Sequence, residues 1–257
     1  MRIATFNVNS IRARKERVLR WLERHRVDVL CLQELKLEDH AFPYKELEAL
    51  GYHSAVHGQK TYNGVAILSR EPIENIALGM GDQVEDPQSR IIAGDTYGMR
   101  VISAYFPNGG AMGSDKYQYK LAWIARLRER IRSELERGGD LILAGDYNIA
   151  PFEDDVARPH EWEGGVLANE EVRAALKEIE ALGLHDLFRP FHRRGGIYSW
   201  WDYRGGGFER GNGLRIDHIY GTRGLLEDTI GAIVDREERT GESPSDHAPV
   251  IVEIDRR

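Results

Sequence analysis

Short apolar runs bounded by turn or polar residues recur along the whole chain, and they constrain its fold more than any other feature. Each run spans four to six residues, and most are rich in β-branched side chains, which is typical of buried strands. The runs lie at residues 3–6, 27–32, 64–68, 101–105, 141–144, 216–220 and 249–254. The sequence therefore predicts a fold built largely on buried strands.

Helical periodicity is limited to three segments. Apolar residues share one helix face within residues 124–135, 172–182 and, more thinly, 11–26. The second of these follows Asn169, a good N-cap, and Gly183 stands where a C-cap is expected. Adjacent strands that look hairpin-connected are expected at residues 64–69, 73–78, 89–95 and 99–105. No repeat or linker divides the chain, so we expect one α/β domain over residues 1–257, with mixed or antiparallel sheets.

Composition excludes several classes of protein. The 257 residues include 35 Lys plus Arg and 42 Asp plus Glu, a formal net charge of -7, with 41% hydrophobic residues. This apolar fraction is too high for a disordered chain. No apolar run approaches the ~20 residues of a membrane span or resembles a secretory leader. The single cysteine, Cys31, cannot form an internal disulfide, which fits a reducing cytoplasm, and the acidic balance argues against a general polyanion-coating protein.

Carboxylates and amides repeatedly flank the predicted strands. They are Asn7 and Asn9, Glu34, Asp146 and Asn148, Asp217, and Asp246 with His247. Strand ends are rigid platforms for chemistry, and several carboxylates that converge there need a cation or protonation. A hard divalent ion such as Mg²⁺ fits oxygen ligands, and no Cys/His cluster indicates zinc.

Each of these signals is weak by itself. Gly145-Asp146-Tyr147-Asn148 alone is more often a tight turn, and Asp246-His247 alone could be a helix cap or a surface pair. Their order across the chain is what favours a functional site.

That order resembles the exonuclease III family of apurinic/apyrimidinic endonucleases. This family lies within a wider group that includes pancreatic deoxyribonuclease and the inositol polyphosphate phosphatases. The matching segments are residues 6–9, 32–36, 62–67, 105–108, 145–148, 198–204, 214–218 and 245–249. The resemblance implies an α/β fold, a four-layer α/β/β/α sandwich of two packed mixed sheets with helices outside and the site at one edge.

The resemblance also implies a role for each polar residue of the site. Glu34 would be the main metal ligand, with Asn9 and Asp246 near the ion; some relatives have Asp at the position of Asn9. His247 would contact the scissile phosphate and stay charged through a hydrogen bond to Asp217. Asp146, with Asn148, would orient or deprotonate the attacking water. The residues that would contact the phosphate are Asn7, Tyr105, Asn108 and Lys36. Whether Asp146 is the base or only positions the water stays open.

Two basic segments favour nucleic acid as the substrate. Residues 189–223 carry a local charge of +4 with interleaved aromatics, and from these we select Arg204 and Arg215 as DNA contacts. Residues 10–26 carry a charge of +5, more often a solvated helix face, and Arg12 is the contact selected there. Met112, in the loop at residues 109–115, is a candidate wedge into DNA.

By the same resemblance, an apolar pocket would take a flipped-out abasic sugar. Its lining would be Trp200, Leu214 and Ile216, whereas Trp201 is more easily explained as a core residue.

We therefore expect a Mg²⁺- or Mn²⁺-dependent phosphodiester hydrolase acting on double-stranded DNA. It would cut 5′ to an abasic site and trim 3′ ends as exonuclease or 3′-phosphodiesterase, as a cytoplasmic (in a prokaryote, nucleoid-associated) monomer without a membrane partner. Two alternatives remain: a phosphatase of the same fold that acts on small or lipid phosphoesters, and a non-enzymatic nucleic-acid binding module.

Overall fold

The apolar runs pair into two sheets of six strands in the computed structural model, which describes residues 1–256. The first sheet has the order β11-β12-β1-β2-β4-β3, and the second has the order β5-β6-β7-β8-β10-β9. The strands of the first sheet are β1 (Arg2–Asn7), β2 (Val29–Gln33), β3 (His53–His57), β4 (Val65–Ser69), β11 (Thr229–Val234) and β12 (Val250–Ile254). Those of the second are β5 (Glu74–Leu78), β6 (Ile91–Thr96), β7 (Met99–Tyr105), β8 (Asp140–Asp146), β9 (His185–Asp186) and β10 (Asp217–Gly221).

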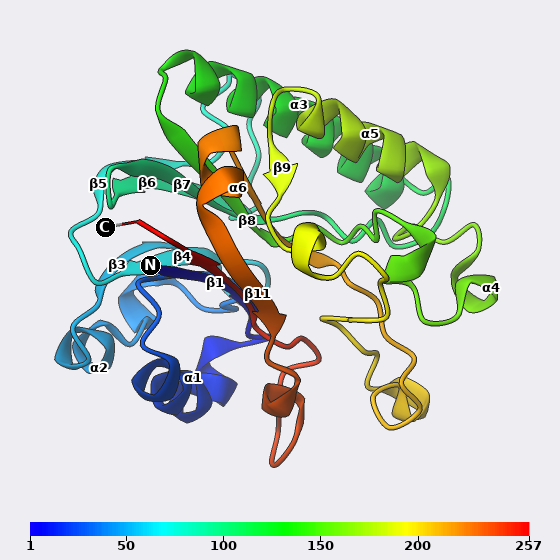
Figure 1. Cartoon of the computed structure of the whole chain (residues 1–257), viewed down its shortest axis with the longest axis horizontal. Coiled ribbons are helices and arrows are strands. Elements are labelled where there is room, and N and C mark those ends of the chain that lie inside the picture. Colours follow the sequence, from blue (N-terminus) through cyan, green and yellow to red (C-terminus); the bar gives the residue numbers. More distant parts are fainter. Residues whose placement is uncertain (257) are drawn as a thin grey trace.

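Helices cover the outer faces of both sheets (Figure 1). The helices of the described chain are α1 (Ile11–His25), α2 (Tyr44–Ala49), α3 (Asp115–Glu136), α4 (Pro159–Trp162), α5 (Glu170–Glu180) and α6 (Arg223–Asp228). Short 3-10 turns are η1 (Asp39–Ala41), η2 (Glu153–Asp155), η3 (Arg189–Phe191), η4 (Arg204–Gly206) and η5 (Arg236–Arg239). Figure 1 shows α3 and α5 side by side above one sheet, with α1 and α2 below the other. The predicted four-layer sandwich is confirmed.

The alternation of side chains along each strand produces the layers. In β2, Val29 and Cys31 pack between the sheets, whereas Leu30 and Leu32 pack under α1 and α2. In β8, Ile142 likewise faces the other sheet, while its neighbours face α3 and α5. Strands buried on both faces explain why the runs are continuously apolar rather than alternating.

Sequence signals also set the helix ends. Ser10, Ser114 and Asn169 each accept a hydrogen bond from a backbone N–H in the first turn of α1, α3 and α5, respectively. Helix α1 ends at His25, and its C-cap Arg26 has the left-handed conformation usual after a helix, with φ of 47°. The predicted N-cap of α5 is therefore confirmed.

Strand direction brings the polar residues to one edge. The parallel strands β1 and β2 both end there, and so do the parallel strands β7 and β8. Strands β10 and β12 are antiparallel to their neighbours β8 and β1, so they begin at this same edge, and Asp217 pairs with Asp146. Residues at the ends of β1, β2, β7 and β8 and at the starts of β10 and β12 therefore lie close together at this edge.

One predicted hairpin is wrong. Strand β4 pairs with β2 and β3, whereas β5 belongs to the other sheet and pairs with β6. The chain crosses between the sheets at residues 70–73, and a sequence pattern of two neighbouring strands does not distinguish a crossing from a turn. The hairpins from β5 to β6 and from β6 to β7 are present.

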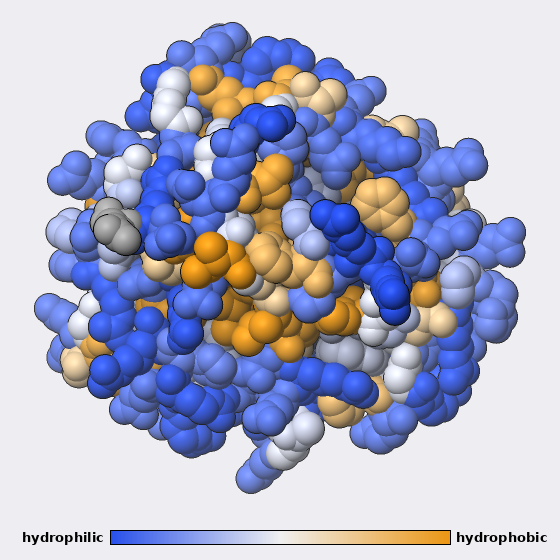
Figure 2. All heavy atoms as spheres, in the orientation of Figure 1, coloured by the Kyte–Doolittle hydropathy of each residue, from blue (hydrophilic) through white to orange (hydrophobic). Residues whose placement is uncertain are grey.

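The face shown in Figure 2 is mostly hydrophilic, with apolar side chains gathered over β11. Ile230 and Ile233 of this edge strand are 59% and 52% exposed. No helix within residues 1–256 is long and apolar enough to cross a membrane.

Candidate active site

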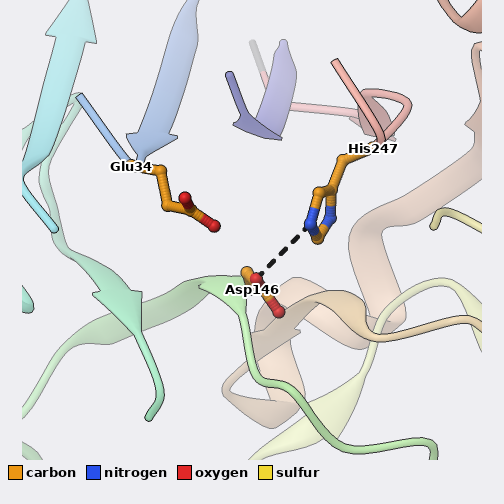
Figure 3. A group of neighbouring side chains, drawn as sticks. All are labelled: Glu34, Asp146 and His247. Atoms are coloured by element: carbon orange, nitrogen blue, oxygen red, sulfur yellow. Dashed lines mark ion pairs between the residues drawn. The ribbon is translucent and has the colours of Figure 1, made fainter. Parts of the chain in front are cut away.

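Three side chains from distant parts of the chain form the centre of the site. Glu34 follows β2, Asp146 ends β8, and His247 precedes β12. One ligand atom from each lies within 4.8 Å of the other two, and Figure 3 shows Glu34 and His247 above Asp146. The His247 Nε2 atom is 3.7 Å from Asp146 Oδ2. The predicted convergence of these strand ends is therefore present in the structure.

Asn7 bridges the two carboxylates, and Tyr105 binds one of them. The Asn7 amide donates to Glu34 Oε1 and to Asp146 Oδ2, both at 2.9 Å. The Tyr105 hydroxyl donates to the same Glu34 oxygen at 3.0 Å. Burial, with Glu34 and Asp146, raises the pKa of Tyr105 well above its ordinary value, so Tyr105 remains a hydrogen-bond donor.

His247 is held as a cation by Asp217. Its Nδ1 lies 2.8 Å and 3.0 Å from the two carboxylate oxygens of Asp217, which is fully buried and also accepts a hydrogen bond from Ser199 Oγ at 2.6 Å. Burial alone lowers the pKa of His247, but the charges of Asp217 and Asp146 raise it to about 10. The second ring nitrogen, Nε2, therefore carries a proton that faces the site.

Asn148 fixes the orientation of Asp146. The Asn148 backbone N–H donates to Asp146 Oδ1 at 2.8 Å, and its amide donates to Asp146 Oδ2 at 3.2 Å. The Asn108 amide in turn donates to Asn148 Oδ1 at 3.0 Å. Burial raises the pKa of Asp146, and the positive charge of His247 offsets part of this rise. Such a carboxylate is well suited to accept a proton near neutral pH.

At four positions that follow strands, the backbone adopts the left-handed conformation and turns the chain towards the site. Asn9, Glu34, Lys36 and Asn148 have φ values of 44°, 53°, 56° and 49°. This conformation costs a residue other than glycine about 1 kcal/mol or more, although asparagine tolerates it best. Strained residues concentrated at a packed edge are typical of functional sites.

The carboxylates present fit a divalent cation. Protonated His247 cannot bind a metal, so Glu34 and Asp146 are the members of the central cluster that offer anionic oxygen ligands. Lys36 Nζ adds positive charge 2.8 Å from Glu34 Oε2 and donates to Asn9 Oδ1 at 2.6 Å. The cluster favours a hard, oxygen-binding ion.

Asn9 and Asp246 lie together beside this cluster. The Asn9 amide donates to Asp246 Oδ1 at 2.9 Å, and the indole N–H of Trp200 donates to Asp246 Oδ2 at 3.0 Å. Both Asp246 oxygens therefore already accept hydrogen bonds, and the metal roles of Asn9 and Asp246 stay predictions.

The structure contradicts the role expected of Arg215. Its side chain is 1% exposed and donates to Asp155 Oδ1 and Asp186 Oδ2, both at 2.8 Å. Arg189 also pairs with Asp155. Arg215 therefore stabilises the interior, and DNA cannot reach it in this conformation.

The abasic pocket is not open in this structure. Leu214 and Ile216 are 0% and 1% exposed, so neither lines an accessible cavity. Trp200 is half-buried and packs edge-on against Trp162, with ring centroids 5.5 Å apart. Trp201 is buried in the core, as predicted.

The two basic segments are only partly available to DNA. Arg12 and Arg204 are exposed, although Arg204 pairs with Asp202 at 2.8 Å. In contrast, Arg17 and Arg24 of α1 pair with Glu238. Met112 is 48% exposed at its loop and stays a candidate wedge.

Sequence reasoning missed a second group of residues near the site. Arg90 lies over the Tyr105 ring at 4.6 Å and lines a groove of about 470 Å³ together with Asn108 and Lys116. Trp162, which contacts Trp200, and the buried Lys120 were also missed. No motif spacing links these side chains to the strand ends, so the sequence carries no signal for them.

Comparison with known proteins identifies the family of the chain. Residues 4–247 match the model of the endonuclease/exonuclease/phosphatase family. The chain is 36% identical to exodeoxyribonuclease III of Haemophilus influenzae, over 99% of this chain and 100% of that protein. It is 31% identical to an exodeoxyribonuclease of Bacillus subtilis, over 97% and 98% of the two chains.

Solved structures show the same similarity. The 3′ phosphatase NExo from Neisseria, bound to a product DNA hairpin, is 43% identical with a TM-score of 0.97, and an AP endonuclease from Archaeoglobus fulgidus is 39% identical with a TM-score of 0.96. Both matches cover 100% of each chain. The chain belongs to the endonuclease/exonuclease/phosphatase family and is a divalent-metal-dependent phosphodiester hydrolase.

Proposed function

We propose that this protein is a DNA repair nuclease that hydrolyses the phosphodiester 5′ to an abasic site and also trims 3′ ends of double-stranded DNA. The observation that carries the proposal is the cluster of Glu34, Asp146 and protonated His247 at one edge of the sandwich. In-line hydrolysis of a phosphodiester needs an aligned water, a group that accepts its proton, and positive charge at the phosphate. This cluster provides groups for each requirement.

Each side chain has one task in this scheme. Asp146, held by Asn148, aligns the attacking water and accepts its proton. The imidazolium of His247 stabilises the charge that develops on a phosphate oxygen. A divalent cation at Glu34, with Mg²⁺ or Mn²⁺ as the proposed ions, would supply further stabilisation of that charge.

The groove at Asn108 favours DNA over a small phosphoester. It is lined by Asn108, Arg90 and Lys116, and its two cations are suited to the phosphates of a DNA strand. The relatives named above include an exodeoxyribonuclease III, a 3′ phosphatase bound to a DNA hairpin and an AP endonuclease.

One observation favours processing of 3′ ends as the stronger activity. An extruded abasic sugar needs a pocket, and the side chains of Leu214 and Ile216 are fully buried. A terminal 3′ nucleotide or phosphate needs no such extrusion. The chain is also 43% identical to a 3′ phosphatase over its full length.

A panel of substrates tests these activities. Purified protein is incubated with a duplex that contains one abasic analogue, the same duplex intact, a duplex with a 3′-phosphate, and an inositol polyphosphate, each with Mg²⁺, Mn²⁺ or EDTA. Metal-dependent nicking at the abasic site or release of the 3′-phosphate supports the proposal. Release of phosphate from the inositol compound alone refutes it.

The Asp146→Asn variant is the matched control for contamination by other nucleases. We expect its activity to fall by about 10²–10⁴-fold while DNA binding is retained, because only the proton acceptor is removed. We also propose that the protein acts as a monomer in the cytoplasm. Light scattering in solution checks the monomer, and cell fractionation checks the location.

A further inference from the structure

Lys120 is a buried cation directly behind the active-site loops. It lies on α3 and is 0% exposed. Its ammonium donates to three backbone carbonyls, of Asn148 at 2.7 Å, Val166 at 2.8 Å and Asn108 at 3.2 Å. Within residues 1–256 no carboxylate accepts a hydrogen bond from it, and the negative charge that acts on it is that of Asp146.

Burial of a lysine side chain without a counter-ion is energetically unfavourable. Removing an ammonium from water without a counter-ion costs several kcal/mol, which three carbonyl contacts offset only in part. A methionine has nearly the same length and would fill the same volume without this cost. Burial lowers the pKa of Lys120 to about 7, while Asp146 acts in the opposite direction. What only the lysine can do here is donate to three separate segments at once.

The backbone also closes tightly around the lysine stem. A Cβ atom at Gly109, where φ is 98°, would lie 3.1 Å from Lys120 Cδ and 3.3 Å from Val166 Cβ. Glycine is therefore needed at this position both for its conformation and for the close approach. The loop that carries Asn108 thus contacts Lys120 through its carbonyl and through Gly109.

Two of the three carbonyls belong to residues that form the active site. Asn148 binds both oxygens of Asp146 through its backbone N–H and its amide, and Asn108 binds the Asn148 side chain. Asn148 also has a left-handed backbone, with φ of 49°, which needs support from its surroundings. Lys120 holds the carbonyl of the same residue from the opposite side.

We propose that Lys120 is a positioning residue, whose ammonium locks the Asn108 and Asn148 loops together and thereby sets the orientation of the Asp146 carboxylate. This inference rests on the proposed function only in assigning Asp146 to the attacking water. Lys120 itself touches neither substrate nor metal.

The test is Lys120→Met, measured for activity, stability and loop order. We expect kcat on the best cleaved duplex to fall about 10- to 100-fold, because a small misplacement of a catalytic group is costly, while KM changes less than about threefold. The melting temperature alone does not decide the role, because removing the buried charge and leaving three carbonyls without their donor act in opposite directions. A lower melting temperature with unchanged kcat per folded molecule would make Lys120 a structural residue and overturn the proposal.

Two matched lysine variants separate positioning from binding. Lys116→Met lies one turn earlier on α3, is exposed and faces the groove, so it should raise KM and leave kcat unchanged. Lys177→Met, exposed on α5, should change neither.

A double-mutant cycle tests the route through Asn148. In an Asn148→Ala background, Lys120→Met should cause little additional loss of kcat, since both changes disturb the same carboxylate. A full additional loss would show that Lys120 acts elsewhere.

Hydrogen exchange keeps the inference testable even if wild-type protein cleaves none of the substrates. Lys120→Met should then accelerate exchange of backbone amides within residues 106–110 and 147–150 and leave β1 and β2 unchanged. Unaltered exchange in those two loops refutes the inference independently of the proposed activity.

Discussion

Asp217 controls the charge of His247 without touching the open part of the site. It is fully buried, and both of its oxygens lie within 3.0 Å of His247 Nδ1. Its negative charge makes the imidazolium stable in surroundings that would otherwise favour the neutral ring. The proton on Nε2 is thus a property of the pair and not of the histidine alone.

Asp217→Asn should therefore change the pH profile of catalysis. With the carboxylate gone, the raised pKa of His247 falls by about 1–3 units, so the imidazolium is lost at a lower pH. We expect the alkaline limb of the kcat profile to move to lower pH by that amount, so that kcat at pH 8 falls by up to about 10-fold. Initial rates between pH 5 and 10 measure this.

The control is Asp255→Asn, which makes the same chemical change at an exposed residue. It should leave the profile unaltered. If the alkaline limb of the kcat profile does not move in Asp217→Asn, the charge of His247 does not depend on Asp217.

At the scale of residues, the position of a side chain in the site could be predicted where a strand end or a motif marks it in the sequence. The edge that gathers Glu34, Asp146 and His247 follows from strand ends that the sequence already marks. Arg215 was not predictable in this way, because its partners Asp155 and Asp186 lie 60 and 29 residues away and in no pattern. An arginine beside aromatic residues looks the same in sequence whether it faces DNA or a buried carboxylate.

At the scale of elements, α1 serves mainly as a support for the loop that leads to Asp246 and His247. Arg17 donates to the carbonyls of Glu238, Thr240 and Glu242 at 2.8–3.0 Å, and Arg14 donates to that of Pro244 at 3.1 Å. The basic run that looks like a DNA-binding face in the sequence is thus largely used inside the protein. The hydrogen bonds join the first helix to the last loop, which no local pattern can predict.

Arg17→Met should release this loop. The loss of hydrogen bonds from a charged group to the loop carbonyls, together with the Glu238 ion pair, should lower the free energy of unfolding by about 2 kcal/mol. We also expect faster proteolysis within residues 238–245. Thermal melting and limited digestion measure the two effects.

Arg20→Met is the matched control on the same helix. Arg20 is exposed and has no ion pair with any residue of the described chain. The free energy of unfolding of this variant should therefore differ from that of the wild type by less than about 0.5 kcal/mol. Equal effects of the two variants would mean that α1 does not hold the loop.

At the scale of the whole molecule, the two sheets are joined by polar as well as apolar contacts. Thr5 Oγ1 donates to Gln33 Oε1 at 3.1 Å, and the Gln33 amide donates to Ser103 of the facing sheet at 3.3 Å. Apolar runs predict the sheets, but they do not predict which sheet each strand joins, as the crossing between β4 and β5 shows. One domain over residues 1–257 stays a prediction, and a single melting transition would support it.

The pH dependence of that transition should depend on His218, a fully buried residue of β10 that lies next to Arg215. Its Nε2 donates to the Ile149 carbonyl at 2.9 Å, while Nδ1 accepts from Arg215 at 3.1 Å. Burial, with Arg215, lowers the pKa of His218 to about 4. Between pH 6.5 and 4 the unfolded chain therefore binds a proton that the folded protein does not, so this contribution is complete above pH 6.5 and is lost as the pH falls.

A His218→Gln variant isolates this contribution from Asp146, whose raised pKa acts in the opposite direction over part of the same range. Glutamine can donate and accept in place of the ring but cannot bind the proton. The difference in unfolding free energy, wild type minus variant, should decrease by about 3 kcal/mol from pH 7 to pH 4. Denaturant melts at both pH values measure it. A difference that stays constant would mean that His218 binds its proton equally well in both states, and that the Arg215 cluster can rearrange to accept a second cation.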